Sequence, residues 1–313
     1  MNGSVKKASV AQVGPSVVAA TTLPDPDRTA RSVGLAPLSM LGLEPWLLVQ
    51  AAAGAGFSFV GLRVRAVTAD EPFHDLAAAG RNARLTLRAL QSTGLQVRDI
   101  EFLMLDGHVG PQDWEPMLEA GAGLGARTLT VAASDPDRSR LVDTLTRLTA
   151  DAAGYGIVPT LEAIAYQEVR TLPEASQLAA AAGCGVLPDA LHYLRVGATP
   201  EDARTAAGLT PLVQLCDAPA AAPEDRAGLL HESRAERALP GHGACDLKGL
   251  LGAFDDGTPI SVEVPNPRLA EIGPFDYAHE LMRATQEVLA LGQDIGCQTP
   301  TGQRCPSGQH EAS

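Results

Sequence analysis

One pattern of local chemistry recurs along this chain: an Ala-rich helix end, then a glycine, then a short apolar run. It occurs in AAAGAGFSFVGLRV, EAGAGLGARTLTVA, DAAGYGIVPTLE and AAAGCGVLPDA, which are residues 51–64, 119–132, 151–162 and 180–190. Glycine ends a helix because it readily adopts the left-handed C-cap conformation, and a continuous apolar run is typical of a strand buried on both faces. The pattern therefore predicts helix-to-strand junctions of a parallel sheet.

Extending this pattern along the chain gives a set of short apolar segments separated by amphipathic ones. The segments expected to be strands are 32–37, 58–63, 96–104, 127–132, 157–161, 185–188, 212–216 and 259–264. Strands that alternate with helices form either an open doubly wound sheet or a closed barrel, and a count of eight favours closure. We therefore expect a single-domain α/β fold, a (β/α)₈ (TIM) barrel, over residues 31–292. The polar, Pro- and Gly-containing segments 1–30 and 293–313 are expected to be disordered tails.

Charge and composition exclude several classes of protein. The formal net charge is −13, which argues against a nucleic-acid partner, because such binding depends on clustered Lys and Arg. No run of about 20 apolar residues is free of Gly, Pro or charge, so no membrane span is expected. The cysteines match neither a disulfide framework nor a paired zinc motif, and a cytoplasmic location is expected. They are Cys184, Cys216, Cys245, Cys297 and Cys305.

Two motifs have ordinary structural interpretations. GAGLG at 121–125 resembles a phosphate-binding loop, but it precedes a strand instead of following one, so close helix–strand packing explains it better. The charged stretch HESRAER at 231–237 is compatible with a solvated helical turn, because charge runs usually face water.

Polar residues that close apolar strands are the main candidates for function, because barrel active sites lie at the carboxyl ends of the strands. The ends of the fifth to eighth expected strands carry several such residues. They are Glu162, Asp189 with His192 three residues later, Gln214 followed by Asp217, and Glu263. One carboxylate at a strand end can simply cap the next helix, but several that converge repel one another unless a cation lies between them. An oxygen-rich set of this kind suits Mn²⁺ or Mg²⁺ better than zinc.

These strand ends resemble those of the xylose-isomerase-like barrels, the sugar phosphate isomerase/epimerase group, which also includes inosose dehydratases and 3-dehydroshikimate dehydratases. The resemblance runs from about residue 32 to 290. It implies the metal ligands Glu162, Asp189, Gln214 and Glu263. Gln214 departs from the pattern, since the corresponding ligand is commonly His, and a neutral amide oxygen binds metals more weakly than imidazole.

Further residues are expected to contact the substrate. Arg237 in ESRAERALPGHG resembles an arginine that contacts the substrate in this group, and its planar fork suits a carboxylate or a diol. His192 is expected to contact the substrate or carry a proton. His108 is a further candidate for a substrate contact at the mouth of the barrel. Trp46, Trp114 and Tyr166 are candidates for an apolar wall, but core packing is the favoured interpretation for each of them.

The first functional hypothesis is a metal-dependent isomerase or epimerase acting on a sugar-like hydroxy-ketone or hydroxy-aldehyde through an enediolate, with Glu162 and Glu263 as bases. The same intermediate can expel a hydroxyl group, so a lyase acting on a keto-cyclitol or a 3-dehydroshikimate-like compound is the alternative. A barrel without metal that serves as a binding or scaffold protein is a third possibility. An abasic-site endonuclease, another activity of this barrel group, is disfavoured by the acidic charge. A homodimer is compatible with the Ala-rich helical exterior.

Overall fold

The computed structural model describes residues 31–68, 70–78 and 80–293, and the expected N-terminal tail and residues 294–313 lie outside this part. Eight parallel strands form one sheet in the order β6-β5-β4-β3-β2-β1-β8-β7. The strands are β1 (Val33–Leu35), β2 (Phe59–Arg63), β3 (Gln96–Leu105), β4 (Thr128–Ala133), β5 (Val158–Glu162), β6 (Gly185–Leu187), β7 (Val213–Leu215) and β8 (Ile260–Val262). A single bridge between Asp189 and Gln214 joins the β6 edge to the β7 edge. The expected (β/α)₈ barrel is confirmed.

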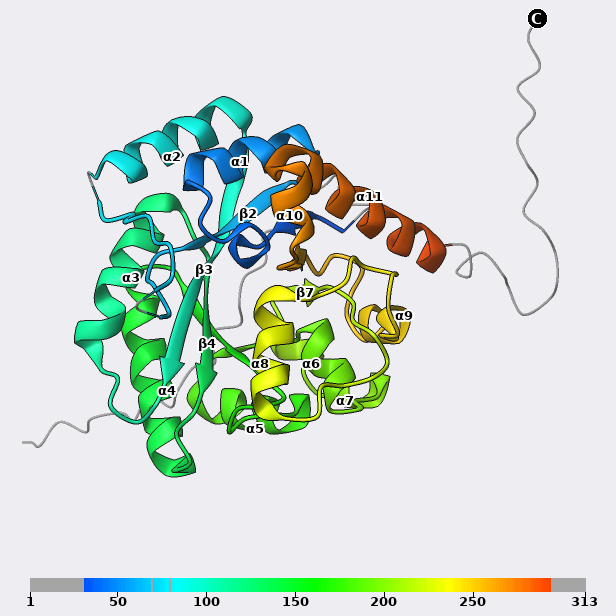
Figure 1. The fold of residues 1–313 in the computed structure, drawn as a ribbon. Coiled ribbons are helices and arrows are strands. Elements are labelled where there is room, and N and C mark those ends of the chain that lie inside the picture. The colour runs from blue at the N-terminus through cyan, green and yellow to red at the C-terminus, as the bar shows by residue number, and fades with distance from the viewer. Residues whose placement is uncertain (1–30, 69, 79, 294–313) are drawn as a thin grey trace, which may run out of the picture.

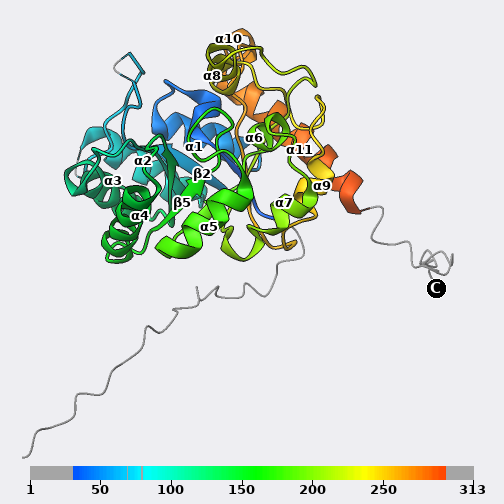
Figure 2. The same cartoon turned by 90° about the horizontal axis from the view of Figure 1, so that it is seen from below.

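Helices surround the sheet on its outside (Figures 1 and 2). They are α1 (Pro45–Gly54), α2 (Arg81–Thr93), α3 (Pro111–Leu124), α4 (Arg138–Ala153), α5 (Leu172–Ala182), α6 (Ala190–Arg195), α7 (Pro200–Arg204), α8 (Arg226–Ala235), α9 (Leu247–Leu251), α10 (Arg268–Ile272) and α11 (Pro274–Gln293), with 3₁₀ turns η1 (Pro37–Met40) and η2 (Ala207–Leu209). Two junction glycines adopt the predicted left-handed C-cap, since Gly125 ends α3 with φ 85° and Gly183 ends α5 with φ 73°. At the third junction the prediction is wrong for the cap itself, because Gly154 ends α4 in a right-handed conformation with φ −62°. None of the helices in the described part has the length and apolar character needed to cross a membrane.

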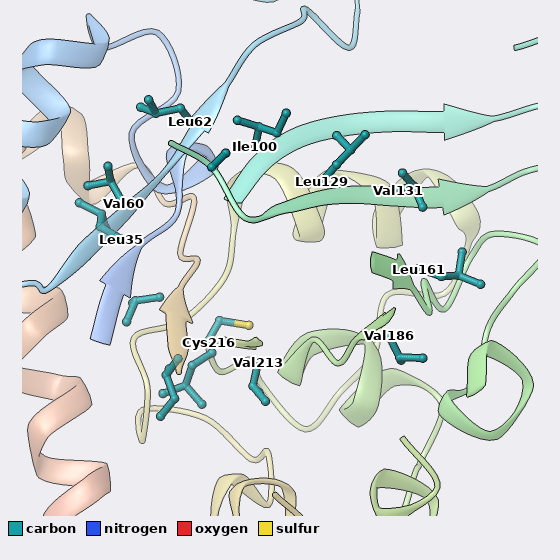
Figure 3. Packing of buried hydrophobic residues seen from close by; sticks show 14 of the residues in the cluster. Leu35, Val60, Leu62, Ile100, Leu129, Val131, Leu161, Val186, Val213 and Cys216 are labelled. Carbon is teal, nitrogen blue, oxygen red and sulfur yellow. The ribbon is translucent and has the colours of Figure 1, made fainter. Parts of the chain in front are cut away.

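The hydrophobic core lies between the sheet and the helices. Strand residues that point outward are apolar and buried, as Ile100, Leu129, Leu161 and Val186 illustrate on successive strands (Figure 3). GAGLG belongs to this layer, because Gly121 lies so close to the sheet that a Cβ there would stand 2.5 Å from Ile100 Cδ1. The packing interpretation of that motif is therefore supported.

The inward-facing positions alternate with these and are largely polar. Buried polar residues of the strands include Asp99, Thr130, Thr160 and Ser261. A separate small apolar cluster of Phe59, Leu187 and Leu212 is also buried. The register shifts along β3, but on β5 and β8 the alternation continues, so the polar positions of these two strands lead to Glu162 and Glu263 at the mouth of the barrel.

Several boundaries differ from those expected. Four strands are shorter than predicted and span three residues each, namely β1, β6, β7 and β8. In these strands the apolar segment continues beyond the last residue that pairs with a neighbouring strand. The HESRAER stretch is only partly solvated. Glu232, Ser233 and Arg237 are buried, so the solvated-turn interpretation is wrong for these three residues.

Candidate active site

A cavity of about 210 Å³ opens at the carboxyl end of the barrel. Three of the four predicted metal ligands line it, namely Glu162, Gln214 and Glu263, together with His192 and Arg237. Asp189 lies behind this wall and is 2 % exposed. The strand ends that the sequence singles out therefore meet at one place, as the parallel barrel requires.

Arg237 is buried between two of the carboxylates. Its Nη1 lies 2.6 Å from Asp189 Oδ2, and its Nη2 lies 2.8 Å from Glu263 Oε2. The Ser233 carbonyl, one helical turn earlier, accepts a hydrogen bond from Arg237 Nε at 2.9 Å. A guanidinium satisfied in this way is a fixed counter-charge inside the cluster, and in this structure its substrate-contacting role stays a prediction.

Gln214 projects from β7 beside Glu263. Its Nε2 donates a hydrogen bond to Glu263 Oε1 at 2.8 Å, so both carboxylate oxygens of Glu263 are engaged. The Oε1 atom of Gln214 is buried and has no hydrogen-bond partner among the described residues. A buried amide oxygen without a partner is unfavourable unless water, substrate or a cation meets it.

His192 lies on α6, one turn after Asp189. The Asp189 side chain caps this helix by accepting the backbone N–H groups of Leu191 and His192. The ring Nε2 of His192 lies 3.6 Å from Glu162 Oε1, and its Nδ1 has no partner among the described residues. Tyr166 meets the imidazole edge-on, with 5.5 Å between ring centroids.

Burial and mutual repulsion set the protonation of this cluster. Burial, with the charges of Asp189 and Glu263, raises the pKa of Glu162 well above its usual range. Burial works in the same direction on Asp189, but the Arg237 guanidinium, His192 and the hydrogen bonds from both residues together outweigh it and lower the pKa of that carboxyl. Burial also lowers the pKa of His192 to about 4, so the ring is neutral near pH 7. The cluster therefore holds more carboxyl groups than one guanidinium can neutralise, and the raised pKa of Glu162 favours the protonated form of that group.

The opposite wall holds residues that sequence reasoning missed. Arg63 ends β2, and its guanidinium contacts Glu101 Oε1 and Glu71 Oε1, each at 2.8 Å. All three side chains line the cavity. Arg63 and Glu101 do close or interrupt apolar strands, so the strand-end criterion that found Glu162 was also applicable to them.

Other predicted candidates lie elsewhere. His108 is exposed and does not line the cavity, because the ten residues of β3 carry the following loop beyond the mouth, near the Asp135–Arg140 ion pair. Trp114 is buried on α3 and donates a hydrogen bond to Asp151, and Trp46 packs under Arg81 on the outer surface. The substrate-contact hypothesis for His108 and the wall hypothesis for both tryptophans are therefore wrong in this structure. Tyr166 does line the cavity.

The donor set fits a divalent cation in its chemistry. The unpartnered Gln214 Oε1 and the carboxylates of Glu162, Asp189 and Glu263 supply four oxygen donors, the type that Mg²⁺ and Mn²⁺ prefer. In the described residues, no three or more His, Cys, Asp or Glu side chains are grouped closely enough to hold a metal ion. Arg237 lies between two of the carboxylates, so metal binding would require its contacts with them to rearrange.

The fold and the cavity define a (β/α)₈-barrel protein with its site at the carboxyl ends of the strands. A family model described as "Xylose isomerase-like TIM barrel" matches residues 49–290, and the chain belongs to this family. No curated protein matches it in sequence.

Solved structures agree on the fold. A xylose isomerase-like TIM barrel/4-hydroxyphenylpyruvate dioxygenase fusion protein is 23 % identical with a TM-score of 0.69, and the match covers 89 % of this chain but 46 % of the fusion protein, less than half its length. The IolI protein with a bound zinc atom is 17 % identical, TM-score 0.67, over 83 % of this chain and 98 % of its own. The probable 3-DHS dehydratase AsbF of Bacillus anthracis is 13 % identical, TM-score 0.61, over 82 % and 98 %. At these identities the likeness shows the fold alone.

Proposed function

We propose that the chain is a lyase of the dehydratase type, which removes a proton next to the carbonyl group of a small polyhydroxy compound and then expels a β-hydroxyl group as water. One observation carries the choice of reaction. His192 and the hydrogen-bonded hydroxyls of Tyr166 and Ser233, 2.7 Å apart, line the same cavity, so a base and an oxygen-bound proton donor lie side by side.

In the proposed reaction, His192 and Tyr166 transfer protons to and from the substrate and end in their starting protonation states. His192 takes the proton from the carbon, and the C–H electron pair forms the enediolate. The β C–O bond then breaks, and the leaving oxygen takes the Tyr166 proton and departs as water. The proton held by His192 returns to Tyr166, so the site regains its starting state. A divalent ion held by Glu162, Asp189, Gln214 and Glu263 would, when bound, stabilise the negative charge on the carbonyl oxygen.

An aldose–ketose isomerase is the second candidate, because His192 can instead return its proton to the neighbouring carbon of the same intermediate. Epimerisation fits the geometry less well. It requires bases on both faces of the substrate, and both oxygens of Glu263 are already engaged by Gln214 and Arg237.

The test follows keto-cyclitols and hydroxy-ketones in D₂O by mass spectrometry and by enone absorbance. We expect the wild-type protein to release water, and His192→Asn to lose both water release and hydrogen exchange at carbon. Tyr166→Phe should retain that exchange while water release slows by roughly 10²- to 10⁴-fold. Tyr155→Phe, outside the cavity lining, is the matched control and should behave as the wild type.

Two results would contradict the proposal. Deuterium incorporation by the wild-type protein without water release would assign the isomerase reaction instead. Water release that is equally fast in Tyr166→Phe would remove Tyr166 from the mechanism.

A further inference from the structure

We infer that Arg234 binds a carboxylate group of the substrate at the rim of the cavity. This inference rests on the proposed function, because it identifies a charged group of the same substrate. Three arginines line the cavity, namely Arg63, Arg234 and Arg237. The first is neutralised by Glu71 and Glu101, and the third by Asp189 and Glu263. Arg234 is the remaining one.

Arg234 is exposed and has no ion-pair or hydrogen-bond partner within the part of the chain that the structure describes. It lies on α8, directly after Ser233 and three residues before Arg237. Because the charged group of Arg234 lies in solvent, it can bind a ligand without breaking a contact inside the protein.

The surroundings of Arg234 extend the positive charge along one side of the mouth. Arg226, two turns earlier on α8, lies over the Tyr166 ring at 5.8 Å, and its Nε donates a hydrogen bond to the Tyr166 carbonyl. The positive charge of Arg234 also acts on the Tyr166 hydroxyl. A substrate whose reacting carbon lies beside His192 and Tyr166 therefore has a cation within reach of its far end.

The rest of the lining limits the charge that this position can accept. Asp70 is an exposed carboxylate that lines the cavity, and the chain as a whole carries a net charge of −13. A doubly charged phosphate meets this field with about twice the repulsion of a carboxylate. The planar guanidinium also matches both oxygens of a carboxylate. A single carboxylate is therefore the anionic group that the site suits best.

Calorimetric titration with three ring-sized probes tests this without turnover: quinate, which carries a carboxylate, neutral myo-inositol, and myo-inositol 1-phosphate. We expect quinate to bind more tightly than either of the others. Arg234→Gln should weaken quinate binding by roughly 10- to 100-fold, the usual effect of losing a charge-assisted pair, and leave myo-inositol unchanged. Arg147→Gln, an exposed change of the same charge on α4, should leave all three unchanged.

The inference is overturned if the wild-type protein binds quinate no better than myo-inositol, or binds the phosphate more tightly. It is equally overturned if Arg147→Gln weakens quinate binding as much as Arg234→Gln, since bulk charge would then explain the effect. Because binding is measured apart from reaction, quinate binding that depends on Arg234 alongside a failed Tyr166 test would reject the proposed reaction and keep the carboxylate site.

Discussion

Asp99 lies inside the barrel on β3 and is fully buried. Neither of its carboxylate oxygens has a hydrogen-bond partner among the described residues, and the absence of a side chain at Gly61 leaves room for it, since a Cβ there would stand 2.7 Å from Asp99 Oδ2. Burial and the neighbouring charge of Glu101 raise the pKa of Asp99 to about 7. A carboxyl group in such surroundings is stable in its protonated form.

We predict that Asp99 makes the stability of the protein depend on pH. Its pKa is higher in the folded than in the unfolded state, so its contribution is fully present below about pH 4 and is lost as the pH rises toward 7. The shift corresponds to a loss on the order of 4 kcal/mol. In urea unfolding between pH 4 and pH 8, Asp99→Asn should lack this loss. Parallel pH profiles for wild type and variant would show that Asp99 is ionised in the fold.

The residues of the site were predictable to different degrees. Glu162 and Glu263 were found because a charged residue at the end of an apolar strand can be recognised in the amino-acid sequence. The partners of Arg237 were not, because a contact between the segment after α8 and two strand ends depends on how the chain closes in space. The same holds for His108, whose distance from the mouth depends on the length of β3.

Among the elements, the loop after β7 is held by one side chain. Asp217 is buried, and its Oδ1 accepts the N–H groups of Ala218 and Cys245, each at 2.9 Å, while Oδ2 accepts that of Gly241 at 3.1 Å. The backbone at Asp217 also forms a bridge with Ala238, next to Arg237. The strand-end pattern marked Asp217 with the other carboxylates, but in the structure it serves the backbone of this loop.

We therefore predict that Asp217→Asn destabilises the protein by about 2 to 3 kcal/mol, because an amide group places N–H donors where three backbone donors already point. Chemical unfolding measures this change. Asp225→Asn is the matched control, since Asp225 caps α8 through the Gly228 N–H and Asn caps helices equally well. Equal effects of the two substitutions would contradict the anchoring role.

At the scale of the whole molecule, the barrel is unevenly closed. β3 and β4 are joined by an extended ladder, whereas β6 and β7 meet only at the Asp189–Gln214 bridge, where the Gln214 N–H donates to the Pro188 carbonyl at 2.8 Å. The repeated junctions predicted a barrel because they count strands. They contain no information on how completely the first and last edges pair, since that depends on strand stagger around the whole circle.

We predict that this join exchanges its amide hydrogens faster than the β3–β4 ladder, and that added Mg²⁺ or Mn²⁺ slows exchange there, because both bridge residues belong to the proposed metal site. Hydrogen exchange with mass spectrometry measures both effects. Glu263→Ala is the comparison variant and should show weaker protection by metal. Uniform exchange around the barrel, or no change on adding either ion, would contradict the prediction.

The bridge between Asp189 and Gln214 has a consequence for how this protein can change over generations. Both residues are proposed metal ligands, and the side chains of both also make contacts within the fold: Asp189 caps α6 and pairs with Arg237, and Gln214 donates to Glu263. A substitution at either position is therefore expected to change the stability of the site as well as its binding. Productive changes are therefore expected first at residues such as Arg234, which borders the cavity but takes no part in closing the barrel.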